Sequence, residues 1–383
     1  MAAKRLVLLG AGMTGRGQVA QLAADAGWDL TLVDSDAALV RRLQQAGRYT
    51  VQLLGDATAV RQIDGYRALH VGDSEALAAA VHAADLVVTS VLEPNLPAAA
   101  ATLAAALGPR LADPLAAPLN IIAAENMSDS STVLAGYVAT HLDPALWAGR
   151  VAFPNSMIAR VVPVAADPLH ILTEAYSEWT ADRLTALAPL PDLSGLEWVD
   201  NQAARLQRKL FIHNAGHAVC GYLGWLRRHR LIDQAARDPE VMAAVRAAVA
   251  EAGAAISAEH GFPRETVSAY ERNLCERLVI DTLPDDIRRV IRQPLRKLGI
   301  QERLLGPLQL CLRHGLPCHA LCRGIAAVLA CRLEGDEQFD RLAATVGERG
   351  AVGALTHLTG YQPPPTVATA IAAAWSELAP GGA

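Results

Sequence analysis

The stretch that decides the fold is Arg5-Leu6-Val7-Leu8-Leu9, followed directly by Gly10-Ala11-Gly12-Met13-Thr14-Gly15. The apolar run predicts a short strand, and a helical pattern opens near Arg16. In this setting, the G-x-G-x-x-G spacing is typical of a dinucleotide-binding turn. The first glycine permits a tight turn, the second lets the backbone approach a pyrophosphate, and the third allows close helix–strand packing. The N–H groups and dipole at the helix N-terminus would then hold the diphosphate.

A second predicted strand, residues 29–33, ends in Asp34. Asp34 follows the glycines by roughly 20 residues, where a carboxylate accepts hydrogen bonds from the ribose hydroxyls and repels a 2′-phosphate. The sequence therefore predicts NAD, rather than NADP, as the cofactor. A tight strand–helix turn without a ligand is the alternative interpretation.

Strand-like and helix-like segments alternate through the first half of the chain. Further apolar strands are predicted at residues 66–71, 85–91, 119–124 and 150–153. This alternation is typical of a parallel, doubly wound sheet that is covered on both faces. Thr89 and Glu125 follow two of these strands, and we expect them to border a ligand cleft at the carboxyl ends of the strands.

The pattern changes after a proline-containing stretch at residues 184–197. Beyond it, helical periodicity is predicted at residues 199–225, 239–260, 264–279, 284–292, 295–312, 319–332, 336–348 and 365–377. We therefore predict an α/β protein with a Rossmann-type, NAD-binding domain at residues 1–190. An all-helical domain that carries catalytic and substrate-binding groups is predicted at residues 191–383.

The composition argues against several classes of function. The 383 residues are 52% hydrophobic and 19% charged, as expected for a globular protein with a large core. A net charge of −5 and an aromatic content of 4% argue against nucleic-acid binding. No apolar run approaches the roughly 18 residues of a membrane span, and the N-terminal run is too short for a signal peptide. The six cysteines do not suggest a disulfide framework, so we expect a cytoplasmic protein.

A second informative stretch runs from Lys209 to His217 within the predicted helix at 199–225. At about 100° per residue, Lys209, His217 and Asn214 fall near 0°, 80° and 140°, so all three can face one cleft. An amine, an imidazole and an amide can together move a proton on and off a hydroxyl and stabilise an oxyanion. Ordinary surface or core side chains are the alternative interpretation of this spacing.

A basic run extends from Arg288 to Lys297. Its guanidinium groups, aided by a helix that opens at Pro294, could hold a phosphate or carboxylate. A solvated basic helix face is the alternative.

His314, Cys318, His319 and Cys322 have side chains of the kinds that bind zinc. The cluster lacks a C-x-x-C pair, however, and no second ligand cluster is obvious in the sequence. We therefore predict no metal site and interpret the segment as a turn that enters an apolar helix.

Several stretches carry a family resemblance: residues 10–17, 120–127, 177–179, 208–217, 292–298 and 324–327. Over essentially its whole length, the chain resembles the polyol-specific long-chain dehydrogenases, or mannitol dehydrogenase family. The resemblance implies metal-independent hydride transfer between NAD and a secondary alcohol, with Lys209 as the general base. It implies that Asn126 and Asn214 hold the developing oxyanion and that His217 orients the substrate. The lysine must be neutral near pH 7, which burial and neighbouring donors can achieve.

The predicted site has three parts. The catalytic residues are Lys209, Asn126, Asn214 and His217. The cofactor-binding residues are Gly10, Gly12, Met13, Thr14, Gly15, Arg16, Asp34, Thr89 and Glu125. The substrate-binding residues are Arg160, Arg292, Arg296, Lys297 and His319.

Several positions depart from the family pattern near the expected substrate site. Ala159 and Asn155 stand where the family generally has aspartates. Ile212 and His213 replace a Thr-Leu pair, and Cys318 precedes His319 where a histidine is expected. The loss of two carboxylates would lower the repulsion felt by an anionic substrate.

Three functions are consistent with these features. The first is NAD-dependent interconversion of mannitol 1-phosphate and fructose 6-phosphate, or of a related polyol phosphate. The second is NADH-dependent reduction of another anionic 2-oxo compound, such as a uronate or a 2-oxo acid bearing phosphate or phosphonate. The third is an NADH-binding sensor without turnover, against which the intact Lys209, Asn214 and His217 argue. The expected partner is a small anionic molecule, and the expected state is a monomer or small homo-oligomer.

Overall fold

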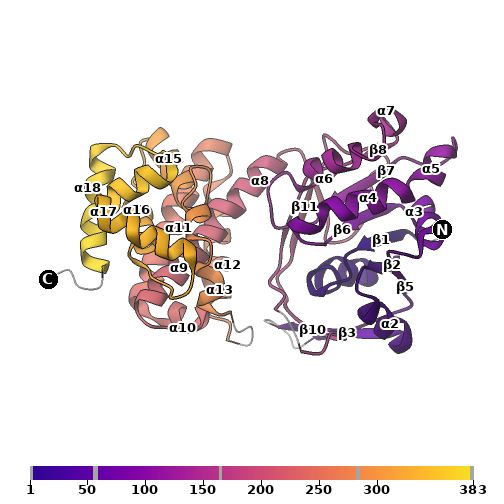
Figure 1. Cartoon of the computed structure of the whole chain (residues 1–383), viewed down its shortest axis with the longest axis horizontal. Helices are drawn as coiled ribbons and strands as arrows, with labels where there is room; N and C mark the ends of the chain where they lie inside the picture. The colour runs from indigo at the N-terminus through magenta and orange to yellow at the C-terminus, as the bar shows by residue number, and fades with distance from the viewer. Residues whose placement is uncertain (1–2, 55–58, 164–165, 282–284, 380–383) are drawn as a thin grey trace. The chain divides into compact units, whose positions relative to one another are not determined.

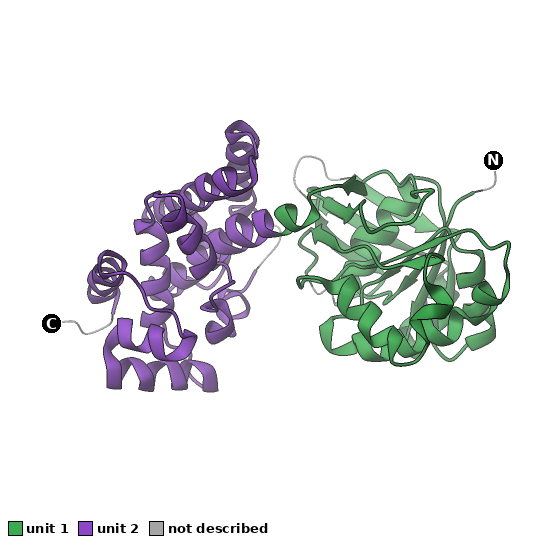
Figure 2. Cartoon of the chain, turned by 90° about the horizontal axis from the view of Figure 1, so that it is seen from above, with its two compact units in different colours: residues 1–206 green, residues 207–383 purple. Residues whose placement is uncertain are grey.

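A computed structural model describes residues 3–54, 59–163, 166–281 and 285–379 (Figure 1). The chain divides into two compact units, residues 1–206 and 207–383 (Figure 2). The observed boundary, after residue 206, lies later in the chain than the predicted one, after residue 190. The first unit extends further because Leu193, Leu196 and Trp198 pack into one of its cores.

The first unit is built on a six-stranded parallel sheet with the order β5-β2-β1-β6-β7-β8. Its strands are β1 (Arg5–Leu9), β2 (Asp29–Asp34), β5 (Arg67–His70), β6 (Leu86–Thr89), β7 (Leu119–Ala123) and β8 (Val151–Ala152). This is the doubly wound order of a Rossmann domain, in which the direction of winding reverses between β1 and β6. The predicted fold class is confirmed.

Successive residues of each strand point to opposite faces of this sheet and enter two separate cores. Leu6 and Leu8 belong to the core covered by η1 (Gly15–Ala20), α1 (Gln21–Asp25) and α2 (Ala37–Ala46). Val7 and Leu9 belong to the core covered by α3 (Ser74–Ala83), α4 (Leu96–Ala106) and α6 (Ser130–Ala139). Burial on both faces explains why these strands read as continuous apolar runs.

The first unit also contains two three-stranded sheets that the sequence analysis missed. One has the order β10-β3-β4, from His170–Glu174, Arg48–Leu54 and Ala59–Asp64. The other has the order β12-β11-β9, from Glu197–Val199, Glu178–Asp182 and Ser156–Ala159. β10 was missed because it pairs with β3, far earlier in the chain, and β4 was missed because it is largely exposed and polar. Short helices η2 (Glu93–Asn95), α5 (Gly108–Ala112) and α7 (Pro144–Trp147) complete the unit.

The described part of the second unit contains helices and no strand. α8 (Gln202–Arg208) crosses the boundary between the units, and η3 (Lys209–His213) and α9 (Asn214–Leu226) continue it. The remaining helices are α10 (Ile232–Arg237), α11 (Pro239–His260), α12 (Arg264–Leu278), α13 (Ile287–Ile291), α14 (Pro294–Lys297), α15 (Leu305–Arg313), α16 (His319–Ala330), α17 (Glu337–Thr359) and α18 (Pro365–Leu378). α10 was not predicted, and the predicted 295–312 helix is divided into α14 and α15. Residue 284 of the predicted 284–292 helix lies outside the described residues.

Three glycines of α9 allow its neighbours to approach closely. A Cβ atom at Gly216 would lie 2.6 Å from the side chains of Leu274 and Val249, and one at Gly224 would lie 2.5 Å from Ala235. A Cβ at Gly221 would lie 2.9 Å from Val290. α9 therefore packs directly against α10, α11, α12 and α13, which places its first turns within the second unit's core.

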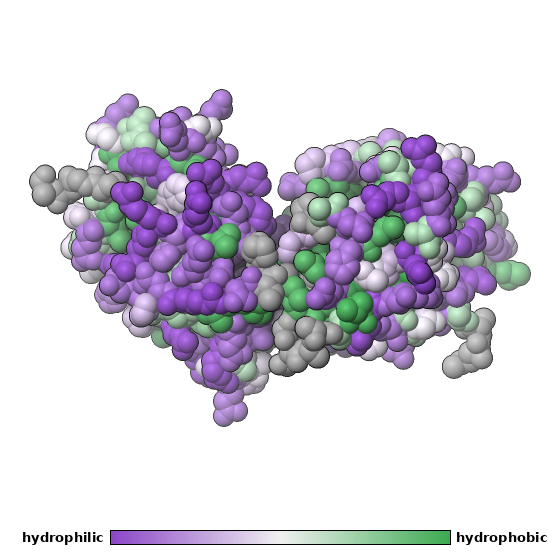
Figure 3. All heavy atoms as spheres, turned by 90° about the horizontal axis from the view of Figure 1, so that it is seen from below, coloured by the Kyte–Doolittle hydropathy of each residue, from purple (hydrophilic) through white to green (hydrophobic). Residues whose placement is uncertain are grey.

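α11 is long and apolar enough to cross a membrane, judged by length and composition. This corrects the expectation that no segment passes such a test. In the structure, Val245, Ala248, Val249 and Ala252 of α11 are fully buried in the helical core. A central core helix passes the same test, so the hydropathy of α11 is weak evidence for a membrane span. On the face drawn in Figure 3, residues of the second unit are predominantly hydrophilic.

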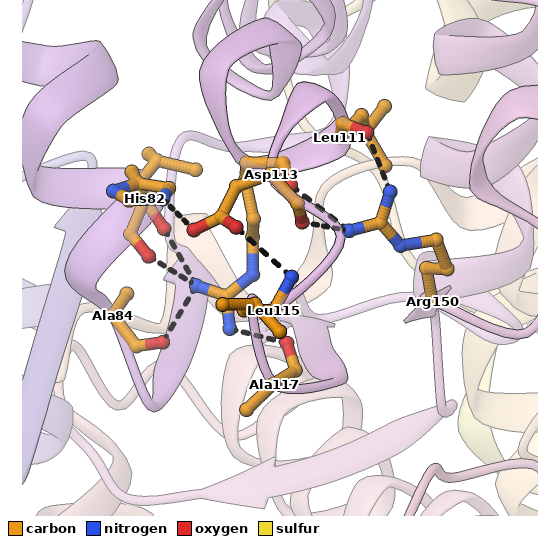
Figure 4. Close-up of polar contacts among 9 residues, drawn as sticks. His82, Ala84, Leu111, Asp113, Leu115, Ala117 and Arg150 are labelled. Atoms are coloured by element: carbon orange, nitrogen blue, oxygen red, sulfur yellow. Dashed lines mark hydrogen bonds and ion pairs between the residues drawn. The ribbon is translucent and has the colours of Figure 1, made fainter.

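A buried arginine, Arg110, donates to backbone carbonyls just before β6 and β7. Figure 4 labels residues of this region, among them Ala84, Ala117 and Arg150. Arg110 of α5 donates to the carbonyls of Val81, His82 and Ala84 at the end of α3, and to Ala117 before β7, at 2.7–2.9 Å. Cations are favoured at helix C-termini because the last carbonyls lack partners there. Arg150, just before β8, donates in the same way to carbonyls near α5.

We expect Arg110→Met to lower the free energy of unfolding by about 3 kcal/mol or more, because a buried polar group left unpaired costs roughly 1–3 kcal/mol. Urea titrations of the full chain measure this difference. Arg41→Met, which removes an exposed arginine from α2, is the matched control and should change stability by less than about 0.5 kcal/mol. Equal stability of the two variants would contradict the assigned role of Arg110.

Candidate active site

The glycine turn after β1 has the geometry that its spacing predicts. Gly10 has a φ of 91°, and a Cβ atom there would lie 2.2 Å from the Ser90 carbonyl oxygen beyond β6. A Cβ at Gly15 would lie 2.3 Å from the carbonyl oxygen of Gly10. Gly12 differs, because a Cβ there would meet no atom within 4 Å. The packing therefore requires the first and third glycines, whereas the second leaves open space through which a ligand can approach the backbone.

The helix after the turn starts at Met13, is π-helical over η1 (Gly15–Ala20), and returns to α-helix at Gln21. Thr14 is exposed at its N-terminus, and Met13 packs partly against the core below. Arg16, expected to contact the cofactor, is buried instead. It donates to the Ala11 carbonyl at 2.6 Å and to the Pro168 carbonyl at 2.5 Å. Its guanidinium therefore braces the turn from within the protein.

Asp34, Thr89 and Glu125 all lie at the carboxyl edge of the sheet. Asp34 ends β2, is partly exposed, and accepts a hydrogen bond from the Asp36 N–H at 2.9 Å. Glu125 is buried and accepts hydrogen bonds from the N–H groups of Val91, at 2.8 Å, and Leu92, at 3.0 Å, and a longer one from Thr89 Oγ1. Burial raises the pKa of Glu125, although these hydrogen bonds act in the opposite direction. Glu125 and Thr89 therefore hold the loop that follows β6.

The segment from Lys209 to His213 is a π-helix, not the α-helix on which the predicted angles rested. The N–H of Asn214 donates to the carbonyl of Lys209, a bond that spans five residues. Residues five apart are 140° apart around an α-helix but lie much closer in angle in the wider π turn. The π-helix therefore corrects the predicted geometry and places Lys209 and Asn214 on one face.

His217 lies one turn beyond Asn214 and is held by a carboxylate that the sequence analysis missed. Its Nε2 lies 3.0 Å from Asp285 Oδ2, and Arg289 donates through Nε and Nη2 to the other Asp285 oxygen. Burial by itself raises the pKa of Asp285, but the contacts with His217 and Arg289 outweigh it and hold that pKa below its usual range. A charged Asp285 therefore orients the imidazole of His217.

His213 is the second unpredicted member of the cluster. Its ring centroid lies 6.2 Å from that of His217, and its Nδ1 is buried with no hydrogen-bond partner among the described residues. Burial, reinforced by the nearby charges of Arg277 and Lys209, lowers the pKa of His213 well below its usual range. His213 is therefore a neutral imidazole near Lys209, and its buried Nδ1 has no hydrogen-bond partner among the described residues.

The residues of the basic run have different surroundings in the structure. Arg289 pairs with Asp285, and Lys297 is buried, where its Nζ donates to the Val290 carbonyl. Burial, with help from neighbouring arginines, lowers the pKa of Lys297 to about 7. Arg296 is exposed and bonds Gln293 and Glu302. Arg292 is exposed, and among the described residues its side chain has no ion pair or hydrogen bond.

Models of known families match most of the chain. The mannitol dehydrogenase Rossmann domain matches residues 4–195, and the mannitol dehydrogenase C-terminal domain matches residues 204–348. The chain belongs to the mannitol dehydrogenase family. A mannitol-1-phosphate 5-dehydrogenase of Brevibacillus brevis is 37% identical over 359 residues, which cover 92% of this chain and 93% of the relative.

Two solved structures share the fold. The mannitol 2-dehydrogenase of Pseudomonas fluorescens, in a ternary complex with NAD and D-mannitol, has a TM-score of 0.73 at 16% identity and covers 100% of this chain and 93% of that chain. A substrate-free D-sorbitol dehydrogenase has a TM-score of 0.79 at 16% identity. The match covers 96% of this chain and 91% of that chain. At such identities, the likeness shows the fold alone.

Two departures from the mannitol dehydrogenase family pattern lie in the first unit. Asn155 donates to Asp129 and accepts a hydrogen bond from the N–H of Thr132 at 3.0 Å, so an aspartate here would face Asp129 with like charge. Ala159 is buried in β9. Arg160, a predicted substrate ligand, donates to the carbonyls of Gly17 and Tyr176 and to Gln21. Burial lowers the pKa of Arg160 to about 10.

The cysteine and histidine cluster is spread over separate contacts. His314 pairs with Glu259 at 2.7 Å, Cys318 is hydrogen-bonded to Cys322, and His319 is exposed at the start of α16. Among the described residues, no group of three or more His, Cys, Asp or Glu side chains is placed to hold a metal ion. Lys209, Asn214 and His217 come together in the second unit, whereas Asn126 lies on an exposed loop of the first.

Proposed function

We propose that this protein is an NAD-dependent dehydrogenase that interconverts a polyol phosphate and a ketose phosphate, with mannitol 1-phosphate and fructose 6-phosphate as the expected pair. The 37% identical relative is a mannitol-1-phosphate 5-dehydrogenase and supports this substrate class. The observation that carries the proposal is the buried Lys209, which a π-helix brings toward the same face as Asn214, one turn before a His217 that is held by Asp285.

The choice of lysine at position 209 supports a role in proton transfer. The chain has 34 lysines and arginines, of which only Lys4, Lys209 and Lys297 are lysines. A guanidinium stays protonated in proteins, whereas an amine can lose its proton when it is desolvated. Lys209 is 8% exposed. Burial disfavours the protonated form of an amine, and a general base must be unprotonated to accept a proton.

Each side chain of the cluster has a distinct part in the proposed reaction. Lys209 accepts the proton of the substrate hydroxyl during oxidation and returns it during reduction. Asn214, and by family resemblance Asn126, donates hydrogen bonds to the oxygen as negative charge develops on it. His217, held by Asp285, orients the substrate, and the unused Nδ1 of His213 is available to a further hydroxyl. NAD, when bound, supplies the hydride acceptor.

The glycine turn supports the choice of cofactor. Open space at Gly12 and the exposed N-terminus of η1 suit a diphosphate, and Asp34 suits a ribose with a free 2′-hydroxyl. Gly10, Gly12, Met13, Thr14, Gly15 and Asp34 would lie closest to the cofactor. Arg16, Thr89 and Glu125 would shape the surrounding loops.

We further propose Arg292 and Arg296, with His319, as the ligands of the substrate's anionic group. Lys297, also predicted for this role, is buried and donates to the Val290 carbonyl, so it is not one of these ligands. Arg292 supports this because it is exposed and has no internal partner among the described residues. Asn155 and Ala159 replace aspartates of the family pattern and so lower the repulsion felt by an anionic substrate. A uronate, or a 2-oxo acid bearing phosphate or phosphonate, is therefore a second candidate substrate class. We also propose a cytoplasmic monomer or small homo-oligomer, since all six cysteines are buried and unpaired.

NADH should be preferred over NADPH, because the carboxylate of Asp34 repels a 2′-phosphate. Measurements of kcat/KM with each cofactor test this preference, and Asp34→Ala should narrow the difference. Equal values for the two cofactors in the unmodified protein would contradict the proposed role of Asp34.

Lys209→Ala should lower kcat by at least about 10²-fold, the usual scale for lost acid–base catalysis. Affinity for NADH, measured by fluorescence titration, should hardly change. Lys209→Arg is the sharper variant, because it keeps a long side chain that donates hydrogen bonds but stays protonated and cannot accept a proton near pH 7. If Lys209→Arg retains more than about half of the activity, Lys209 is not the base.

Arg292→Ala should raise KM for fructose 6-phosphate by at least about tenfold, because hydrogen bonds to charged partners contribute roughly 1.5–3 kcal/mol each. The value of kcat should change less, since a distant phosphate binds the ground and transition states alike. Unphosphorylated fructose provides the control, and its KM should be the same for both proteins. An unchanged KM for fructose 6-phosphate would remove Arg292 from the substrate site.

A further inference from the structure

A cavity in the helical unit lies away from the residues assigned to catalysis. It has a volume of about 980 Å³ and is lined by Trp225, Arg228, Arg230, Asp286, Arg288 and Arg332, among others. Its volume is at the upper end of the range of ligand pockets. Trp225 lies about 12 Å along α9 from His217, at a rise of 1.5 Å per residue. Lys209, Asn214 and His217 do not line this cavity.

The cavity is strongly cationic. Four arginines line it, against the single carboxylate of Asp286, so that their formal charges sum to 4 − 1 = +3. Among the described residues, Arg228, Arg230 and Arg288 form no ion pair. Arg332 donates only to the carbonyls of Leu329 and Cys331, which leaves its charge uncompensated. His229, also in the lining, is paired with Asp238.

The lining of the cavity combines cationic and apolar side chains. The guanidinium of Arg288 lies 5.7 Å from the ring centroid of Trp225, whose Nε1 donates to the Arg332 carbonyl at 2.7 Å. Leu226, Leu231 and Leu378 add apolar surface to the same cavity. A ligand that carries both negative charge and a carbon skeleton would be complementary to this lining.

Arg228 occupies a backbone position that ordinarily takes glycine. It has a φ of 66°, just after the C-terminus of α9, and the His229 N–H donates to the Gly224 carbonyl as in a Schellman motif. A left-handed conformation is strained for arginine and free of strain for glycine. Glycine would end the helix here without strain. Arginine at this position instead adds a guanidinium to the lining of the cavity.

We propose that this cavity is a second ligand site, for a small molecule that carries two or more phosphate groups. Guanidinium groups match phosphate oxygens with paired N–H donors, which gives them an advantage over a single point charge. A net charge of +3 fits two or three clustered phosphates better than one. The apolar residues accommodate the carbon part of such a compound.

Isothermal titration of the full chain with tripolyphosphate tests the proposal, in the presence of saturating NAD so that the cofactor site is filled. One tripolyphosphate should bind per chain, at least about tenfold more tightly than inorganic phosphate. Arg228→Gly should weaken binding by at least about tenfold while the melting temperature stays equal or rises, because glycine relieves the strained backbone. Arg230→Ala should weaken binding similarly without changing the backbone.

Two control variants locate the bound anion. Arg341→Ala removes an exposed arginine of α17 outside the cavity and should bind tripolyphosphate normally. Arg296→Ala, which alters the proposed substrate site, should also bind it normally. Absence of binding, unchanged binding by Arg228→Gly, or an equal loss in Arg296→Ala would overturn the proposal. These are binding measurements, so they stand whether or not the protein reduces fructose 6-phosphate.

Discussion

The close approach of β1 and β6 at their carboxyl ends is the constraint on which the first unit depends. The Ser90 carbonyl oxygen occupies the space that a side chain at position 10 would need, and Gly10 in turn limits position 15. Only glycine allows the chain to turn here, because the turn also requires a positive φ. The winding of the sheet reverses at this point, so the tightest packing and the expected ligand edge coincide.

Two π-helical segments occur in the described parts of the chain, and each lies at a part of the candidate site. One, η1, follows the glycine turn, and the other, η3, carries Lys209. A π turn is less favourable than an α turn and is often associated with function. Here it has a direct geometric consequence, because residues 209 and 214 lie closer in angle in a π turn than in an α-helix. The helical core on both sides of η3, with Phe211 and Ile212 buried, holds this conformation in place.

The chain uses arginine and lysine for different purposes. Arg16, Arg110 and Arg160 donate into groups of backbone carbonyls and join segments that are distant in sequence. A permanently charged, five-donor group suits that structural work. Lysine is rare, and its two buried copies lie in the helical unit, Lys209 on the π-helix and Lys297 at the end of the basic run.

The sequence by itself determined the order of the elements and the kinds of chemistry. Apolar runs separated by helices predicted the parallel sheet, the glycine spacing predicted its ligand edge, and the Lys209–His217 spacing predicted a polar helix face. These signals are local, since each depends on a few neighbouring residues. The tertiary structure alone decided which predicted side chains are available to a ligand: Arg16 and Arg160 are occupied by carbonyls, and Lys297 is buried. It also supplied Asp285 to His217 and changed an α turn into a π turn, because these depend on packing between segments far apart in the chain.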